Sequence, residues 1–305
     1  MSELEGFNLE SVFQSYSKEE IQARLDGLEV DLANSDDEAV YHAIKKVLLF
    51  QIEGFGVSAF TSGMRQYKKG GRLYRARKLD AITNKIEGSD FWEAPKRFIT
   101  EYGRLNKPHQ QLLYASTDAL TPLKEVHLQD DVPFLLTAYD IVEDLEVLEV
   151  GMKIEGMEGV AKSVREKLSV IDAFLSRHFF NTSENAYKVS SVLANKIFKL
   201  GRDGWCYPSV ANAGGVNLCL NLASKTRLKV ACSFIGGLVE GKPKFWSALL
   251  VGNSGRICLF QDWNQTPSIA KNIHDKIFCK PSSVEVAVGQ AQSFDPVDFP
   301  LIIIE

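Results

Sequence analysis

The sequence lacks long apolar runs, cysteine pairs and any dense stretch of positive charge. No run of about 18 or more apolar residues occurs in its 305 residues, which excludes an ordinary membrane-spanning helix. Its first ten residues, MSELEGFNLE, lack the basic flank and apolar centre of a signal peptide. We therefore expect a cytoplasmic protein with no membrane partner.

The five cysteines and five histidines show no spacing that is typical of a metal site. No two cysteines form a CxxC pair, and no two histidines lie at ligand spacing. Cys219, Cys232 and Cys258 interrupt apolar runs, where a reduced cysteine behaves as a small hydrophobic residue. We expect buried thiols, no disulfide and no bound metal.

Charge is distributed unevenly along the chain. Residues 1–60 hold 12 acidic and 4 basic side chains, a net −8, whereas the whole chain has a net charge of −4. The remainder therefore carries a net +4, which is too weak for the cationic stripe of a nucleic-acid-binding protein. A mildly basic body suits a small anionic ligand such as a phosphate ester. Acidic residues on a solvated helical face explain the asymmetry equally well.

The acidic first segment is predicted to be helical. Residues 17–34 begin with Ser17 as a cap and space their apolar side chains at three and four, as an amphipathic helix does. Residues 35–55 repeat the pattern with Ser35 as the cap. Two such helices bury little surface alone. We therefore expect residues 1–65 to pack on the rest of the chain or on a partner, and the sequence leaves open a homo-oligomer.

Residues 66–305 are predicted to form one α+β domain. Strands and helices cluster rather than alternate, which favours mixed, largely antiparallel sheets over a doubly wound fold. A helical insert is predicted over residues 159–180 and 183–201. The predicted strands are rich in β-branched and aromatic residues and end at turn signals: 72–79, 111–116, 134–141, 215–222, 227–238, 244–252 and 256–261.

The stretch GRLNKPHQQLLYASTDALTPLKE, residues 103–125, brings three kinds of side chain into a short span. Arg104 and Asn106 lie in a polar loop, and Tyr114 lies on a predicted strand. Thr121, which precedes a proline, is predicted to cap a short helix with Glu125 in its first turns. Together with an arginine of the preceding strand, these residues could converge on one cleft at the edge of the sheet.

A second stretch, DGWCYPSVANAGGVNLCL, is also unusual for a connector. A Tyr-Pro-Ser bend places the hydroxyl of Ser209 at a tight turn, and two glycines at 214–215 allow close backbone approach before Asn217 enters a strand. Each candidate has a structural alternative. Arg75 could pair with an acid across the sheet, Tyr114 could be core, and Glu125 could favour the start of a helix through its dipole.

Five stretches in this order resemble the RES-domain family, which takes its name from an arginine, a glutamate and a serine. The resemblance covers about residues 70 to 235. It is carried by LYRAR (73–77), YGRLN (102–106), LLYASTDALTPLKEV (112–126), DGWCYPSV (203–210) and GGVNLCL (214–220). The chain departs from the family pattern at Leu105, where the family often has tryptophan, and at Pro108-His109, which replaces a glycine.

The resemblance implies a fold similar to ADP-ribosyltransferase toxins and an enzyme that consumes NAD as substrate, without a further cofactor. Many members of the family are toxins of toxin–antitoxin pairs, so an antitoxin is an expected partner. Residue by residue, the glutamate corresponds to Glu125, the serine to Ser209, and the arginine to Arg75 or Arg104. Tyr114, Asn106 and Asn217 match accompanying substrate-binding positions.

The chemistry of these side chains suits cleavage of the nicotinamide–ribose bond. A carboxylate stabilises the oxocarbenium-like sugar, and an arginine binds the pyrophosphate through paired hydrogen bonds. Tyr114 could stack on the nicotinamide ring, and Ser209 could donate a hydrogen bond to its amide or to a phosphate. The acceptor is open between phosphate and water. Two other functions remain open: ADP-ribosyl transfer to a macromolecule, and a non-catalytic module that binds a partner.

Overall fold

The computed structural model describes residues 13, 15–28, 35–52, 55–58, 64–79, 85–130, 132–150, 161–180, 184–197, 203–252, 256–278 and 302–303. The chain forms two compact units, and each is considered by itself. Unit 1 comprises Met1–Arg65, Lys96–Gln110 and Val147–Tyr207. Unit 2 comprises Gln66–Pro95, Gln111–Glu146 and Pro208–Glu305. The sequence suggests that two domains meet near residue 65, and this domain boundary stays a prediction.

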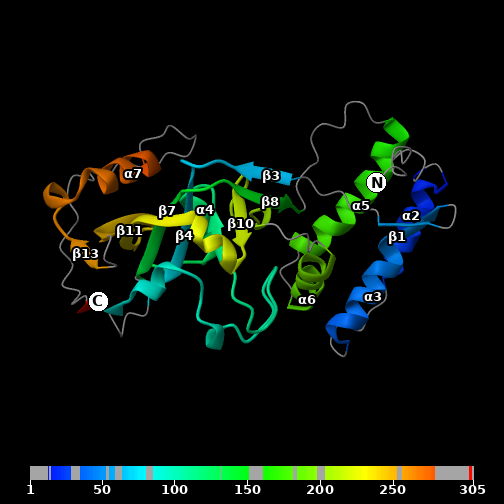
Figure 1. The fold of residues 1–305 in the computed structure, drawn as a ribbon, viewed down its shortest axis with the longest axis horizontal. Coiled ribbons are helices and arrows are strands. Elements are labelled where there is room, and N and C mark those ends of the chain that lie inside the picture. The colour runs from blue at the N-terminus through cyan, green and yellow to red at the C-terminus, as the bar shows by residue number, and fades with distance from the viewer. Residues whose placement is uncertain are drawn as a thin grey trace. The chain divides into compact units, whose positions relative to one another are not determined.

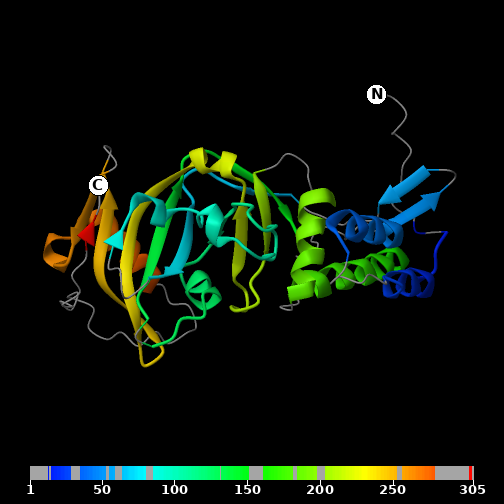
Figure 2. The same cartoon turned by 90° about the horizontal axis from the view of Figure 1, so that it is seen from below.

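Unit 1 is mainly helical (Figure 2). Its helices contact one another in the pairs α2–α5, α5–α6, α3–α6 and α2–α3. Their apolar stripes form the core, as the spacing predicts, with Ile21 of α2, Ile44 of α3 and Ile171 of α5 buried completely. The helices are α2 (Lys18–Asp26), α3 (Asp37–Leu48), α5 (Lys162–Phe180) and α6 (Glu184–Val192), which continues as the π-helical turn Leu193–Ile197.

The starts of the first two helices are specified by their caps. The hydroxyl of Ser17 accepts a hydrogen bond from the amide of Glu20, and the amide of Ser17 donates to Oε2 of Glu20 at 2.6 Å, so the predicted Ser17 cap is confirmed and forms a capping box. For α3 the predicted cap, Ser35, is wrong. Asp36 accepts from the amide of Ala39 at 2.8 Å instead, because the carboxylate lies one residue closer to the first turn.

The chain also forms three short strand pairs. Within unit 1, β1 (Leu49–Ile52) and β2 (Phe55–Ser58) pair antiparallel. Residues 147–149 of β8 (Leu145–Glu149) run parallel to β9 (Gly204–Pro208). In unit 2, β5 (Lys85–Ile86) runs parallel to β14 (Ile302–Ile303). The remaining short strand is β3 (Met64–Tyr67).

The part of the main sheet that belongs to unit 2 has the strand order β13-β12-β11-β7-β4-β6-β10. Its neighbouring strands are antiparallel, and β4, β7 and β11 lie side by side in Figure 1. The prediction of an α+β class with largely antiparallel sheets is confirmed. The strands are β4 (Arg72–Lys78), β6 (Leu113–Ser116), β7 (Phe134–Ile141), β10 (Val216–Leu220), β11 (Leu228–Val239), β12 (Lys242–Val251) and β13 (Ile257–Phe260).

Different elements pack against the two faces of this sheet. On one face, helices α4 (Leu120–Glu125) and α7 (Ser268–Phe278) share a core cluster with the strands, to which Leu123 and Ile273 contribute. On the other face, the buried Tyr139 of β7 donates its hydroxyl to the carbonyl of Phe91 and lies against Trp92. Side chains alternate between faces along each strand, so the register decides which residues lie near α4.

The structure also tests the smaller expectations. Cys206, Cys219 and Cys232 are reduced and buried as predicted, but Cys258 is exposed, because it alternates with inward-facing residues of the edge strand β13. Cys279 lies outside the described residues. Among the helices that the structure describes, none is both long and apolar enough to cross a membrane.

Candidate active site

Glu125 is the last residue of α4, a helix of six residues. Its start is set by Asp118, whose Oδ1 accepts hydrogen bonds from the amides of Leu120 at 3.0 Å and Thr121 at 2.8 Å. The prediction that Thr121 caps this helix is therefore wrong. The hydroxyl of Thr121 instead donates to Oδ2 of Asp118 at 2.6 Å. Glu125 lies in the first two turns, as expected, and the helix ends at this residue.

One oxygen of the half-buried Glu125 carboxylate accepts two short hydrogen bonds. Oε1 accepts from the hydroxyl of Ser209 at 2.6 Å and from the amide nitrogen of Asn217 at 2.6 Å. Within the part of the chain that the structure describes, Oε2 has no hydrogen-bond partner. The protein thus fixes the carboxylate through one oxygen.

Ser209 follows directly after β9. The predicted Tyr-Pro-Ser bend is displaced, because the strand continues through Pro208 and the chain turns only afterwards. The turn is closed by a hydrogen bond of 2.8 Å from the amide of Ser209 to the carbonyl of Gly215. The Ser209 hydroxyl also accepts from the amide of Asn212 at 3.0 Å. Its proton is therefore directed at Glu125.

A neighbouring strand of the sheet orients the side chain of Asn217. It lies on β10 opposite Ser116 of β6 in the antiparallel register. Ser116 donates its hydroxyl to Oδ1 of Asn217 at 2.7 Å, which leaves the amide group to donate to Glu125. Asn217 is only 5 % exposed, so this pair is a buried, satisfied polar unit.

A second layer of polar contacts supports the turn after β9. Asn212 donates to the hydroxyl of Thr121 at 2.7 Å and accepts from Lys124 at 2.8 Å. A Cβ atom at Gly215 would lie 2.2 Å from Oγ1 of Thr121, so the predicted close approach is confirmed at Gly215, whereas a Cβ at Gly214 would have no neighbour within 4 Å. Sequence reasoning missed Asn212 and Asp118. An aspartate just before an apolar helix start was an available signal for the latter.

Two tyrosines lie on the same sheet face as Asn217. Tyr114 is two residues before Ser116 on β6, and Tyr74 of β4 lies opposite Ser116. Both are half-buried. Burial raises the pKa of the Tyr74 phenol, so its hydroxyl stays protonated at neutral pH. The sequence predicted a site role for Tyr114 only, although Tyr74 belongs to the LYRAR stretch.

Arg75 lies on the opposite face of the sheet. Its neighbour Ala76 packs in the core cluster with Leu123 of α4, so the alternation of the strand directs Arg75 away from Glu125. Arg75 lies near Tyr139, and burial lowers the pKa of its guanidinium, although an arginine stays charged. The expected convergence of Arg75 and Glu125 on one cleft is not found.

Arg104 and Asn106 belong to unit 1. The Arg104 guanidinium lies over the rings of Tyr187 and Tyr207, at 5.4 Å and 5.8 Å from their centroids. Its Nη1 is buried without a hydrogen-bond partner among the described residues. Asn106 is 7 % exposed, and its side chain folds over Gly103, where a Cβ would lie 2.2 Å from its oxygen.

Comparisons with known proteins identify the family of the chain. No curated protein and no solved structure matches the chain. The model of one family, the RES domain, matches residues 72–233, which is just over half of the chain and contains Glu125, Ser209 and Asn217. The match begins at β4 and ends within β11. The chain therefore belongs to the RES-domain family.

Proposed function

We propose that this protein is an NAD-consuming enzyme that cleaves the bond between nicotinamide and ribose, by phosphorolysis or hydrolysis. The observation that supports it most is the hydrogen bond between Ser209 and Glu125, which joins two of the residue types that give the family its name. Asn217 donates a second hydrogen bond to Oε1 of the same carboxylate. NAD is the substrate in this proposal, and no further cofactor takes part.

A single fixed carboxylate is enough for this reaction. When the C1′–N bond breaks, its electron pair moves to the pyridinium nitrogen, and nicotinamide leaves as a neutral molecule that needs no added proton. Positive charge develops on the ribose, and the Glu125 carboxylate stabilises it. An anionic oxygen of phosphate, or the oxygen of water, then bonds to C1′, and water releases one of its protons to the solvent in this step. Oε2 of Glu125 is available to accept a hydrogen bond from a ribose hydroxyl or from this nucleophile.

Ser209 and Asn217 act on the substrate through Glu125 in this proposal. Both donate to Oε1, so the carboxylate is oriented before the substrate binds and needs little reorganisation in the transition state. This differs from the substrate contacts that the sequence suggests for the two residues. Both polar groups already have protein partners, and we therefore propose them as positioning residues.

The candidate residues for substrate recognition are considered within each unit by itself. In unit 1, the buried Nη1 of Arg104 is a donor without a partner in the described chain, which suits a pyrophosphate oxygen. Asn106 shapes the same loop. In unit 2, Tyr114 and Tyr74 lie on the face of Asn217, where a ring could stack on nicotinamide.

We further propose an ADP-ribosyltransferase-like fold and a toxin whose partner is an antitoxin. The largely antiparallel sheet of unit 2 and the helical insert α5–α6 between Glu125 and Ser209 support the fold assignment. Membership of the RES-domain family supports the toxin assignment. An expression test in cells, with NAD measured over time, addresses both activity and toxicity.

The direct experiment is to incubate the purified protein with NAD, with and without phosphate, and to resolve the products by NMR. Nicotinamide with a phosphorylated ADP-ribose that appears only with phosphate indicates phosphorolysis. Nicotinamide with ADP-ribose in both samples indicates hydrolysis. Turnover that requires an added macromolecule indicates ADP-ribosyl transfer. Intact NAD in every sample of folded protein would contradict the proposal.

A further inference from the structure

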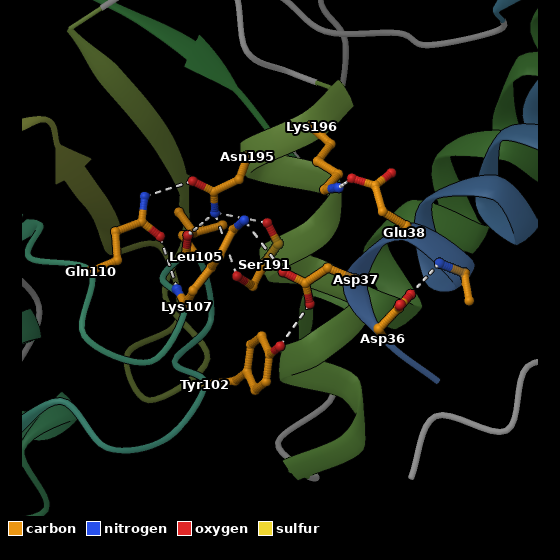
Figure 3. Close-up of polar contacts among 11 residues, drawn as sticks. Asp36, Asp37, Glu38, Tyr102, Leu105, Lys107, Gln110, Ser191, Asn195 and Lys196 are labelled. Atoms are coloured by element: carbon orange, nitrogen blue, oxygen red, sulfur yellow. Dashed lines mark hydrogen bonds and ion pairs between the residues drawn. The ribbon is translucent and has the colours of Figure 1, made fainter. Parts of the chain in front are cut away.

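The loop that carries Arg104 and Asn106 is held at both ends by one carboxylate of the N-terminal helical segment. We call residues 101–107 the Arg104 loop. Tyr102 donates its hydroxyl to Oδ1 of Asp37 at 2.6 Å, and Nζ of Lys107 lies 3.3 Å from Oδ2 of Asp37 (Figure 3). The two oxygens of Asp37 therefore bind the residues that flank Arg104 and Asn106. All of these residues belong to unit 1.

The backbone of the same loop is held from α6 and the π-helical turn. Ser190 donates its hydroxyl to the carbonyl of Arg104 at 2.6 Å, and Asn195 donates to the carbonyl of Leu105 at 2.9 Å. Asn195 also accepts from Gln110 at 2.6 Å, and Gln110 in turn accepts from the amide of Lys107 at 2.9 Å (Figure 3). Asn195 lies in the π-helical turn, a local distortion that often occurs at functional sites.

Asp37 is suited to hold the loop by its position. It is the first residue of α3, where the helix dipole favours a negative charge. Its side chain is 20 % exposed, so the contacts with Tyr102 and Lys107 are shielded in part from water. Burial and the hydrogen bond to Asp37 raise the pKa of Tyr102 to about 12, which keeps its hydroxyl a donor over the physiological range.

We infer that Asp37 is a positioning residue for substrate binding, through the Arg104 loop. The N-terminal helical segment is then part of the structure that forms the anion-binding loop, and is more than an appendage. This inference rests on the proposed function, because it assigns NAD as the ligand of Arg104. Without Asp37, a smaller fraction of molecules holds the loop in its binding conformation, and the apparent affinity falls in proportion.

The test is steady-state kinetics of NAD consumption by the full chain with Asp37→Asn. We expect KM to rise about fivefold, with kcat within about twofold of the wild-type value. A partly exposed ion pair contributes ~1 kcal/mol, and this free energy corresponds to a factor of about five. Glu38→Gln is the matched control. It removes a charge from the same helical turn and an ion pair with Lys196, but leaves both contacts to the Arg104 loop. We expect its KM to be unchanged.

A purely structural role predicts a different result. In that case Asp37→Asn lowers Tm but leaves KM at the wild-type value, or Asp37→Asn and Glu38→Gln raise KM by the same factor. Either outcome overturns the inference. If Asp37→Asn does not fold, Tyr102→Phe removes one of the two loop contacts and should still raise KM.

The proposed function can fail separately. If the folded wild type leaves NAD intact, hydrogen exchange still tests whether Asp37 holds the Arg104 loop in place. The amides of Gly103 and Lys107 are hydrogen-bonded within this region, to the carbonyl of Asn106 and to the side chain of Gln110. We expect faster exchange at these amides in Asp37→Asn and unchanged exchange in Glu38→Gln. Unchanged exchange in both variants overturns the inference.

Discussion

The hydroxyl of Ser209 donates a hydrogen bond of 2.6 Å to Oε1 of Glu125, although 84 positions separate the two residues in the chain. Asn217 donates to the same oxygen at 2.6 Å. One oxygen of the carboxylate is therefore bound by the protein, and we propose that the other faces the substrate.

Ser209→Ala should lower kcat for NAD consumption with little change in KM. A hydrogen bond to a charged group contributes about 1.5–3 kcal/mol, which corresponds to roughly 10-fold to 10²-fold in rate if the bond matters mainly in the transition state. The measurement is steady-state kinetics on folded protein. Ser233→Ala is the control, because it removes another buried hydroxyl hydrogen bond of unit 2, to Thr137. A kcat as low in the control as in Ser209→Ala would count against the proposed role.

Gly215→Ala should destabilise the turn that positions Ser209. The added Cβ would lie 2.2 Å from Oγ1 of Thr121 and 3.0 Å from Asn212, so these side chains must move. We expect a loss of about 1–3 kcal/mol in the free energy of unfolding, measured by denaturant titration. Gly88→Ala is the control, because open space surrounds its Cβ position. Equal losses at the two positions would contradict the crowding at Gly215.

Arg104→Lys and Arg75→Lys should separate the two candidate arginines. Lysine keeps the charge but loses the paired hydrogen bonds of a guanidinium. Because Arg75 lies on the sheet face away from Glu125, we expect a KM for NAD about tenfold higher or more only in Arg104→Lys. A larger rise in KM for Arg75→Lys would show that the assignment is reversed.

Acid should destabilise the protein in part through His274. Its ring is packed 4.7 Å from Trp263 and 6.0 Å from Phe245, measured between centroids, and burial lowers its pKa from 6.5 although Asp275 opposes the shift. The unfolded chain therefore binds more protons between pH 6.5 and the lower folded pKa, so stability falls as the pH drops through this window. Tm measured from pH 7.5 to pH 5 should fall less steeply in His274→Phe. Equal slopes would contradict this contribution.

Much of the fold could be predicted from local patterns. The apolar alternation and turn signals placed seven strands of unit 2, and helical spacing placed α2, α3, α5 and α6. The hairpin β1–β2 was missed, because its apolar residues continue the helical pattern of α3 without a clear break. Strands β8 and β9 were missed because their short segments read as connectors between a strand and a helical insert.

The candidate site was predictable in its residue types but not in its geometry. Glu125, Ser209 and Asn217 could be singled out from their setting, yet their mutual hydrogen bonds depend on the pairing of β10 with β6. The placement of Arg75 also depends on register, since a shift by one residue reverses the face of the sheet. No local pattern specifies which strands become neighbours.

The kcat of Glu125→Gln for NAD tests the central claim most directly. Glutamine keeps the shape and can still accept hydrogen bonds from Ser209 and Asn217, but it removes the charge that stabilises the ribose cation. We predict a loss of about 3 kcal/mol or more of transition-state stabilisation, roughly 10²-fold or greater in kcat. NAD affinity should change far less, because the sugar carries little charge before the bond stretches. Tm should not fall through the helix dipole, since Glu125 ends α4 rather than beginning it. A normal kcat in folded Glu125→Gln would contradict the account.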